Sequence, residues 1–380
     1  IKVSDAACFG PYPFFTSGDD VLAHSVALVE GDNIYLATGG QANIKHYDGE
    51  ASYSTDTYVV NTTQYINTTL LYYYLISIRP YIDSNYFQGS GLKHLQKKDF
   101  KKHELSFPND KDEQKRIAAL LTQIDTVIAE TKSLIKKYRN IKTGLMQDLL
   151  TKGIDENGNI RSEETHKFKD SELGRIPDEW KCTSLGELFD LVSGITPSRS
   201  NTAYFNKDGT NWVKTLDLNE DYLFSTEEKI SDLALKETSI RLHPSGTLLI
   251  AMYGGWIQIG RTSILKNPAT TNQAIVAFYP KNSLRIPVDY VQFFLQVYKN
   301  RWKKCAISTR KDPNISKKDV LKFSFAYPIR IKEAELIVDK ITKIKDFLKT
   351  EENNLLKLQS LREGLLNDLI SGDIRIPSTI

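Results

Sequence analysis

The segment with the most evident potential for chemistry is Pro177-Asp178-Glu179-Trp180-Lys181, which superficially matches the PD-(D/E)xK pattern of metal-dependent nucleases. Carboxylates that share a catalytic metal converge on it from separate elements of a fold. Here Asp178 and Glu179 are adjacent in sequence, so they could not share a metal in that geometry. We interpret the segment as a connection between domains.

The other residue types that support catalysis or bind metals lack the spacing that such sites need. No HExxH or paired-ligand spacing occurs among the histidines, which are His24, His46, His94, His103, His166 and His243. Cys8, Cys182 and Cys305 are far apart, which argues against a zinc site or a disulfide framework and fits a reducing cytoplasm. There is no GxxxxGK[ST] phosphate loop and no [DN]PP[YF] tetrapeptide of an adenine methyltransferase. We therefore predict no catalytic site, no metal and no cofactor.

The composition limits the class of protein but does not indicate which partner it binds. The chain has 380 residues, 26% charged and 40% hydrophobic, enough for two or three soluble globular domains. A net charge of +3 neither requires nor excludes nucleic acid, because binding depends on where lysine and arginine cluster. No apolar run approaches the length of a membrane span, and there is no signal peptide, so we expect no membrane partner.

The elements that must position any site are duplicated along the chain. The segments that start at Pro108 and Pro328 align without a gap at an offset of 220 residues. Pairs that are identical at this offset include Glu113/Glu333, Ile117/Ile337, Thr122/Thr342, Ile124/Ile344, Gly144/Gly364, Leu145/Leu365, Asp148/Asp368 and Leu149/Leu369. So long an ungapped register indicates a tandem repeat.

Each repeated segment is predicted to be one long helix. Apolar residues recur at alternating spacings of four and three, which lays a narrow apolar stripe along a helix and suits two-stranded packing. Pro108 and Pro328 stand before the helices, and Gly153 and Gly372 follow their last apolar turns. Such a stripe alone most often means core packing or homodimerisation. Two copies in one chain favour an antiparallel pair within the monomer.

The segments between the helices have the composition of mixed α+β domains. Runs rich in Val, Ile, Tyr and Thr, bounded by Gly, Pro and Asn, predict strands at 33–38, 56–61, 247–252 and 273–280, and a helix at 70–77 corresponds to 290–297. We therefore predict an α+β fold class with two mixed α/β domains and an intramolecular antiparallel coiled coil, as a pseudo-twofold tandem repeat. The expected parts are a domain at 1–107, a helix at 108–152, a linker at 153–174, a domain at 175–327, a helix at 328–373 and a tail at 374–380.

The chain resembles the specificity (S) subunits of type I restriction–modification systems over essentially its whole length. The resemblance rests on the segment 153–198 with its IPDEW, LGEL and SGITPS motifs, on DEQKRIAALL (112–121), and on the helix ends GLMQDLLTKGI (144–154) and GLLNDLISGDI (364–374). It implies that each globular domain is a target recognition domain that reads one half of a split site in double-stranded DNA. It also implies two methyltransferase (M) subunits, which bring S-adenosylmethionine, and restriction (R) subunits, which bring ATP-driven translocation and cleavage.

The first domain departs from the family pattern. The second domain has a leader at 176–199, whereas the first begins almost directly at GPYPFFTSG (10–18), which aligns near 208–215. With Ile1 in place of an initiator Met, we expect the first domain's leader to be truncated.

DNA recognition needs loops that place donors and acceptors in a groove and cations on phosphates. In the second domain the stretches 196–200, 253–261, 270–273 and 308–311 offer this, and in the first 39–46, 54–57 and 88–91. Their candidate DNA-binding residues are Gly39, Gly40, Gln41, Asn43, Lys45, Ser90, Thr196, Ser198, Arg199, Tyr253, Gly254, Gly255, Gln258, Arg261, Asn272, Gln273, Arg310 and Lys311. For any one of them a turn or a solvated surface side chain is the simpler interpretation.

Two other functions stay open at this point. One is a coiled-coil scaffold whose globular domains bind proteins, and the other is the specificity part of a related fused methyltransferase–nuclease. A salt-dependent, sequence-specific gel shift in the presence of methyltransferase subunits would separate them from the DNA-reading subunit.

Overall fold

A computed structural model describes all of the chain except residues 8, 63–64, 282–284, 307–313 and 377–380. The chain forms two compact units. The first unit contains residues 1–136 and 350–380, and the second unit contains residues 137–349. Each unit therefore holds one globular domain with one part of each long helix, and each is described here by itself.

The second unit is built on a five-stranded sheet in the order β12 (Phe189–Ser193), β19 (Ile275–Pro280), β16 (Leu248–Ala251), β17 (Thr262–Leu265), β14 (Tyr222–Leu223). The ladders are antiparallel except for the parallel β14–β17 pair. All residues of β16 and β17 are buried because apolar clusters cover both faces of the sheet, one of them with α7 (Val288–Val297). This core fixes the strand ends from which the loops leave.

Smaller elements complete the second unit. A three-stranded sheet has the order β15 (Lys229–Ile230), β13 (Phe205–Val213), β18 (Ala269–Thr271), with β13 and β18 parallel, and α6 (Asp232–Glu237) packs beside it. Two ladders are formed by β9 (Phe168–Ser171) with β10 (Gly174–Pro177), and by β11 (Trp180–Ser184) with β20 (Ser324–Pro328). The short helices are α5 (Leu185–Leu188), α8 (Trp302–Cys305) and α9 (Lys317–Lys322).

The first unit repeats this plan. Its sheet order β4 (Ile44–Asp48), β3 (Asp32–Ala37), β6 (Thr57–Val60) corresponds to β17-β16-β19 of the second unit. A second sheet has the order β2 (Val21–His24), β1 (Tyr12–Phe15), β5 (Ser52–Tyr53), and its parallel β1–β5 pair corresponds to β13–β18. The helix α1 (Thr68–Ser77) precedes α7 by 220 residues at both ends. The remaining elements are the 3₁₀ helix η1 (Val3–Asp5), α2 (Arg79–Asn85), β7 (Phe87–Gln88), β8 (His94–Leu95) and α3 (Lys97–Phe100).

This correspondence confirms the predicted α+β tandem repeat. The four predicted strands are present as β3, β6, β16 and β19. Within the described residues the first unit has no counterpart of β11 or β12, the strands that the second domain's leader supplies.

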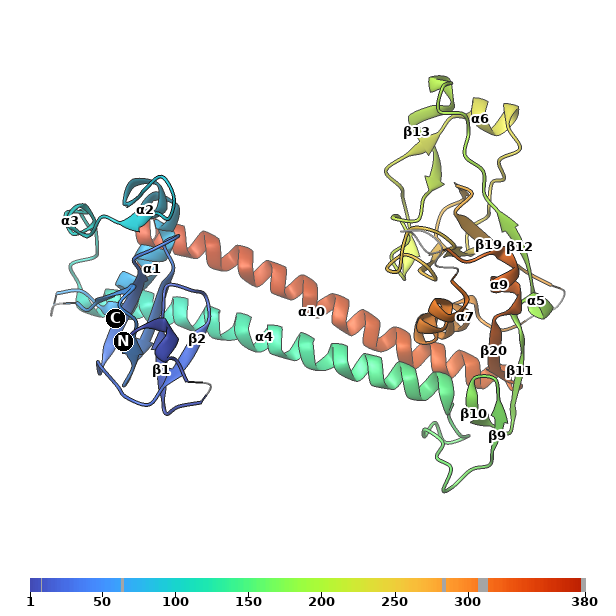
Figure 1. The fold of residues 1–380 in the computed structure, drawn as a ribbon, viewed down its shortest axis with the longest axis horizontal. Helices are drawn as coiled ribbons and strands as arrows, with labels where there is room; N and C mark the ends of the chain where they lie inside the picture. Colours follow the sequence, from blue (N-terminus) through green and yellow to red (C-terminus); the bar gives the residue numbers. More distant parts are fainter. Residues whose placement is uncertain (8, 63–64, 282–284, 307–313, 377–380) are drawn as a thin grey trace. The chain divides into compact units, whose positions relative to one another are not determined.

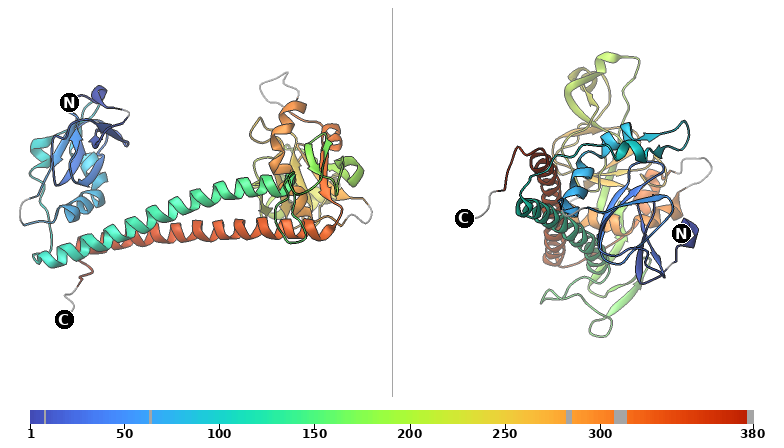
Figure 2. Two further views of the ribbon diagram at one scale, coloured as in Figure 1. Left: turned by 90° about the horizontal axis from the view of Figure 1, so that it is seen from below. Right: turned by 90° about the vertical axis from the view of Figure 1, so that its left-hand side faces the viewer.

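The two long helices are α4 (Lys111–Thr151) and α10 (Ile331–Ser371), and Figures 1 and 2 show them side by side. In the first unit Ile117 and Leu121, near the start of α4, pack with Leu366 and Leu369, near the end of α10. In the second unit the end of α4 meets the start of α10 through the buried residues Met146, Leu149, Leu150, Ala334, Ile337 and Ile341. Start therefore meets end in both units, which confirms the predicted antiparallel packing.

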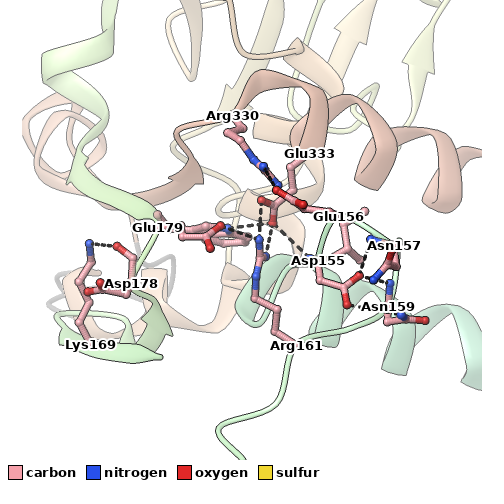
Figure 3. A network of polar contacts seen from close by, with 12 residues as sticks. Asp155, Glu156, Asn157, Asn159, Arg161, Lys169, Asp178, Glu179, Arg330 and Glu333 are labelled. Atoms are coloured by element: carbon pink, nitrogen blue, oxygen red, sulfur yellow. Dashed lines mark hydrogen bonds and ion pairs between the residues drawn. The ribbon is translucent and has the colours of Figure 1, made fainter. Parts of the chain in front are cut away.

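A buried ion pair closes the junction between the two helices in the second unit (Figure 3). The Glu333 carboxylate accepts hydrogen bonds from the Arg161 guanidinium at 2.6 and 3.0 Å, from Trp180 Nε1 at 3.0 Å and from the Ile154 amide at 3.2 Å. The side chains of Arg161 and Glu333 are only 2% and 4% exposed. Gly153, at φ +65°, leaves room for this network, since a Cβ there would lie 2.4 Å from Glu333 Oε1. The polar segment after α4 is thus a packed joint.

The first unit contains a second version of this joint. Glu113, the repeat partner of Glu333, accepts from Arg375 Nε at 2.6 Å and from Nη2 at 2.5 Å. The sequence Gly-Asp-Ile-Arg at 372–375 matches Gly-Asn-Ile-Arg at 158–161, so Arg375 is the counterpart of Arg161. The residues after α10 therefore take the role that the connecting segment takes after α4. Arg375 is 61% exposed, so this joint is the more hydrated one.

Candidate nucleic-acid interface

Three of the predicted DNA-reading stretches emerge at one edge of the second domain's five-stranded sheet. The ladder registers place the ends of β12 and β16 next to the starts of β19 and β17, with Ser193 opposite Val276 and Ala251 opposite Ile275. The chain leaves or enters the sheet there through residues 194–200, 252–261 and 272–274, which we call the second-domain loop edge. Stretches far apart in sequence thus form one continuous surface.

The loop 194–200 is held against the segment that precedes β19. A Cβ at Gly194 would lie 2.2 Å from the Thr271 carbonyl oxygen, so this close approach requires glycine. The Ile195 amide donates to the Thr271 carbonyl at 2.9 Å, and Thr196 Oγ1 donates to Gln273 Oε1. Thr196 and Gln273 are both exposed, so the structure brings these two predicted residues together with their polar atoms at the surface.

The end of the same loop carries a paired cation. Arg199 contacts Glu228 at 2.7 Å and lies over the rings of Phe205 and Trp212, with its carbon Cζ 4.6 and 5.0 Å from their centroids. Lys214 Nζ lies 2.5 Å from the other Glu228 oxygen, and its hydrogen bond, with a second from Arg199, lowers the pKa of Glu228. The charge of Arg199 is therefore partly neutralised by Glu228 within the domain. Ser198 Oγ is 2.8 Å from Ser200 Oγ on the exposed side of the loop.

The glycine pair after β16 starts a tight turn. Gly254 and Gly255 have φ of +112° and +84°, which glycine adopts without strain. The amides of Gln258 and Ile259 both donate to the Gly255 carbonyl at 3.1 Å. Tyr253 is 39% exposed and Gln258 is half-buried. Arg261, also half-buried, donates from Nη1 to the Leu218 carbonyl at 3.3 Å.

The third stretch contributes one exposed side chain, that of Gln273. Thr270 and Thr271 are fully buried, and the Asn272 side-chain oxygen accepts from the Ala274 amide at 3.1 Å. Asn272 therefore shapes the turn, while Gln273 faces solvent. Arg310 and Lys311 lie outside the described residues. The Ile315 amide, which follows them, donates to the Met252 carbonyl at 3.0 Å, so the chain returns to this edge.

The first domain has a corresponding surface, the first-domain loop edge, formed by residues 38–43, 54–56 and 88–94. Leu36 is opposite Ile44 and Ala37 is opposite Thr57, which puts the end of β3 beside the starts of β4 and β6. Gly39 forms a β-bridge to His94, and the Gly40 amide donates to the Lys93 carbonyl at 2.8 Å. The β7–β8 hairpin with Ser90 is thereby joined to this loop, and Gln41 and Ser90 are exposed.

Two predicted residues of the first domain have partners inside it. Asn43 Nδ2 donates to the Gly18 carbonyl at 2.7 Å and to Asp19 Oδ1 at 3.0 Å. Lys45 Nζ donates to the carbonyls of Thr16 at 3.2 Å and Asp20 at 3.3 Å, and desolvation by burial lowers its pKa. These side chains hold the loop at 16–20 in place.

The residues first considered for chemistry have structural roles. Glu179 contacts Arg161 at 3.0 Å and Trp180 binds Glu333, so the PDEWK segment belongs to the helix joint. His243 is buried between Tyr279 Oη at 2.7 Å and Thr271 Oγ1 at 3.3 Å, and this burial, aided by Arg241, lowers its pKa to about 4. Among the residues that the structure describes, no group of three His, Cys, Asp or Glu side chains could hold a metal ion, and no helix is long and apolar enough to cross a membrane.

Sequence reasoning missed two side chains at the second-domain loop edge. Trp256 and Ile257 lie in the turn after the glycine pair and are 47% and 71% exposed. Their signal was present in the sequence: two large apolar residues directly follow the glycine pair, where polar or small turn residues are usual.

The family profile described as "Type I restriction modification DNA specificity domain" matches residues 9–137 and 177–359. The MjaVIII type I restriction enzyme specificity subunit of Methanocaldococcus jannaschii is 24% identical to this chain over 367 residues, which cover 92% of this chain and 81% of the relative.

Two solved structures share the fold. The S subunit of a type I restriction–modification system from M. genitalium matches the whole chain with a TM-score of 0.64, 17% identity and 92% of its own length covered. A chain from a structure on complex assembly and conformational transition of the type I R-M system matches 96% of this chain with a TM-score of 0.58, 16% identity and 92% of its own length covered.

Proposed function

Because this chain belongs to the family of type I restriction modification DNA specificity domains, we propose that it reads a bipartite DNA site with its two loop edges and positions methyltransferase and restriction subunits on that site. Recognition of DNA is the role of this family. Our proposal goes beyond that role in three respects: which surfaces read the DNA, how the site is divided between them, and which subunits this chain positions.

The observation that carries this proposal is that two domains of one topology present different side chains from the same sheet edge. The first-domain loop edge exposes Gln41 and Ser90, whereas the second-domain loop edge exposes Thr196 and Gln273. Amide and hydroxyl groups hydrogen-bond base edges in the major groove, where each base pair has its own donor and acceptor pattern. Two domains with a shared core topology and different exposed side chains suit two different half-sites.

The helix pair supports the second part of the proposal. Its two halves have equivalent packing in the two units, which gives the chain two similar surfaces for two copies of a partner. One structural neighbour comes from work on complex assembly of the type I R-M system. We infer that two methyltransferase subunits and, through the complex, restriction subunits assemble on this chain in the cytoplasm. The subunit itself contributes recognition and no catalytic group.

The decisive experiment is to purify the chain with its methyltransferase subunits and map the adenines that the complex methylates in genomic DNA. We expect a split sequence with a fixed gap. Exchanging residues 175–327 for the corresponding domain of another family member should change one half-site and keep the gap. A continuous site, or an exchange that alters both halves or neither, would contradict the two-reader arrangement.

The same preparation separates the other two functions. A protein-binding scaffold would show no salt-dependent, sequence-specific shift of duplex DNA in the assembled complex. The specificity part of a fused methyltransferase–nuclease would not assemble with separate methyltransferase subunits, whereas we expect this chain to do so. We also expect this chain alone to transfer no methyl group from S-adenosylmethionine to DNA.

A further inference from the structure

The turn at 255–258 presents two large apolar side chains where a turn ordinarily presents small or polar ones. Trp256 and Ile257 are its two central residues, because the Gln258 amide closes the turn on the Gly255 carbonyl at 3.1 Å. Trp256 is 47% exposed and Ile257 is 71% exposed, so they contribute little buried area to the domain. Exposed apolar side chains gathered in this way mark surfaces that become covered on binding.

The turn is anchored firmly although its apex is exposed. Ile259 is buried, the Gly260 amide donates to the Ala251 carbonyl at 3.0 Å, and the Arg261 amide donates to the Gln258 carbonyl at 2.9 Å. A Cβ at Gly260 would lie 2.2 Å from Trp302 Cδ1, so the backbone packs directly on a buried ring. A support of this kind lets the two apolar side chains enter a narrow space without the loop giving way.

The surroundings of the turn favour nucleic acid. Trp256 and Ile257 line a hollow of about 290 Å³ together with Lys299, which is paired with Glu220, and with Lys303, which is exposed. The turn belongs to the same edge as Gln273, since the Met252 amide donates to the Ala274 carbonyl at 2.8 Å. Apolar groups flanked by an exposed lysine and an exposed side-chain amide match a base step next to a phosphate. The area that two side chains can bury is also far smaller than the roughly 800 Å² that each partner buries in a stable protein interface.

We propose that Trp256 and Ile257 form an apolar wedge that enters the stack between two adjacent base pairs of the half-site read by the second domain. Apolar side chains that insert between base steps unstack them and bend the duplex. The cost of unstacking depends on the sequence of the step, so the wedge adds specificity at base pairs that no polar side chain contacts. This inference rests on the proposed function, because it assumes that the second-domain loop edge faces DNA.

The test uses the chain assembled with its methyltransferase subunits and a duplex that carries the mapped site. Adenines in the second half-site and next to it, except the adenine that is methylated and therefore flipped out of the stack, are replaced one at a time by 2-aminopurine, whose fluorescence rises when it is unstacked. We expect one step to brighten on binding of the wild-type complex. The double variant Trp256→Ala with Ile257→Ser should lose that signal and bind about tenfold to a hundredfold more weakly, from the typical effect of one stacked base.

Two further variants control for folding and for loss of apolar surface in general. Trp256→Phe keeps a ring at the apex and should retain most of the signal. Phe224→Ala removes a ring that is 60% exposed and lines a different hollow, with Gly209 and Leu242, so it should leave both readouts unchanged.

The outcomes separate this inference from the proposed function. If the double variant binds DNA and brightens the probe as the wild type does, or if no step brightens in the wild type, the wedge is refuted while a split site would still support the two readers. If the double variant instead fails to assemble with the methyltransferase subunits, the patch is a protein interface and the wedge is refuted. If even the wild-type complex shows no sequence-specific binding, the proposed function itself fails.

Discussion

Removing the charge of Glu333 should destabilise the second unit strongly. The carboxylate accepts four hydrogen bonds, two of them from Arg161, whose side chain is 2% exposed. Burial pulls the pKa of Arg161 down, and the hydrogen bonds and charge of Glu333 more than offset this, so the net pKa is raised. Without Glu333, the one acidic partner that Arg161 keeps among the described residues is Glu179, which is 61% exposed.

For Glu333→Gln we expect a loss of about 3 kcal/mol in the free energy of unfolding of the second unit, at the lower end of the cost of breaking a buried ion pair. The amide keeps an acceptor for Trp180 and Ile154 but places an N–H group against the guanidinium. The double variant Glu333→Leu with Arg161→Met should lose less than Glu333→Gln, because it removes the buried charge together with its partner.

The chain offers a selective probe and a matched control for this experiment. All four tryptophans, Trp180, Trp212, Trp256 and Trp302, belong to the second unit, so tryptophan fluorescence during urea unfolding reports on that unit alone. Glu113→Gln makes the same change in the first unit, where Arg375 is 61% exposed, and should leave the tryptophan transition in place. A Glu333→Gln transition within about 0.5 kcal/mol of the wild type, the usual range for surface substitutions, would show that the pair is not buried as described.

Three other predictions concern the core, the helices and the site. The pKa of His243 is about 4 in the folded state and about 6.5 in the unfolded state, so only the unfolded state binds this proton as the pH falls from 6.5 toward 4. The free energy of unfolding of the second unit, measured in urea, should therefore fall by up to about 3 kcal/mol over that range. His243→Gln should remove this part of the pH dependence. Ile124→Asp should cost several kcal/mol in thermal unfolding followed by circular dichroism, because Ile124 is 9% exposed, and Ile344→Asp should cost less at its half-buried position; equal costs would contradict this packing. Four residues inserted into α4 add about 6 Å of helix and should lengthen the tolerated gap between the half-sites without altering either half-site. The gap is measured by mapping methylated adenines in genomic DNA, and an unchanged gap would show that the length of the helices does not set it.

The repeat and the apolar stripes were sufficient to predict the architecture, because both depend on spacings of three, four and 220 residues that any reader can count. The ends of the helices followed from Pro108, Pro328, Gly153 and Gly372, residues whose backbone preferences are independent of the rest of the fold. The two buried or partly buried Arg–Glu contacts at the ends of the helices could not be predicted in this way. Arg161 looks like one more charged residue in a polar segment, and only the folded chain shows that it meets Glu333, 172 residues away.

The candidate site shows the same division. The loops could be placed at strand ends from composition, and the structure joins them at one edge of each domain. Which side chains stay exposed and unpaired could not be predicted, because Asn43, Lys45 and Arg199 have partners that lie 25 to 29 residues away. Such partners depend on how the loop folds back on its domain. Local sequence does not encode that path.

The two copies of the repeat distinguish what the fold requires from what recognition leaves free to vary. Identical pairs at the 220-residue offset, such as Ile117/Ile337 and Leu149/Leu369, are buried contacts of the helix pair, where a change in either copy would open a cavity. Glu113 and Glu333 are likewise equal because each anchors an arginine from the segment that follows the partner helix. The exposed side chains of the loop edges carry no such requirement, and there the copies differ: the loop after β3 presents Gln41, and the corresponding turn after β16 presents Trp256 and Ile257. Under the proposed function, a framework held constant by the packing of the helix pair, with readers that are exposed side chains of the loops, would allow one half-site to change while the other half-site and the gap stay fixed.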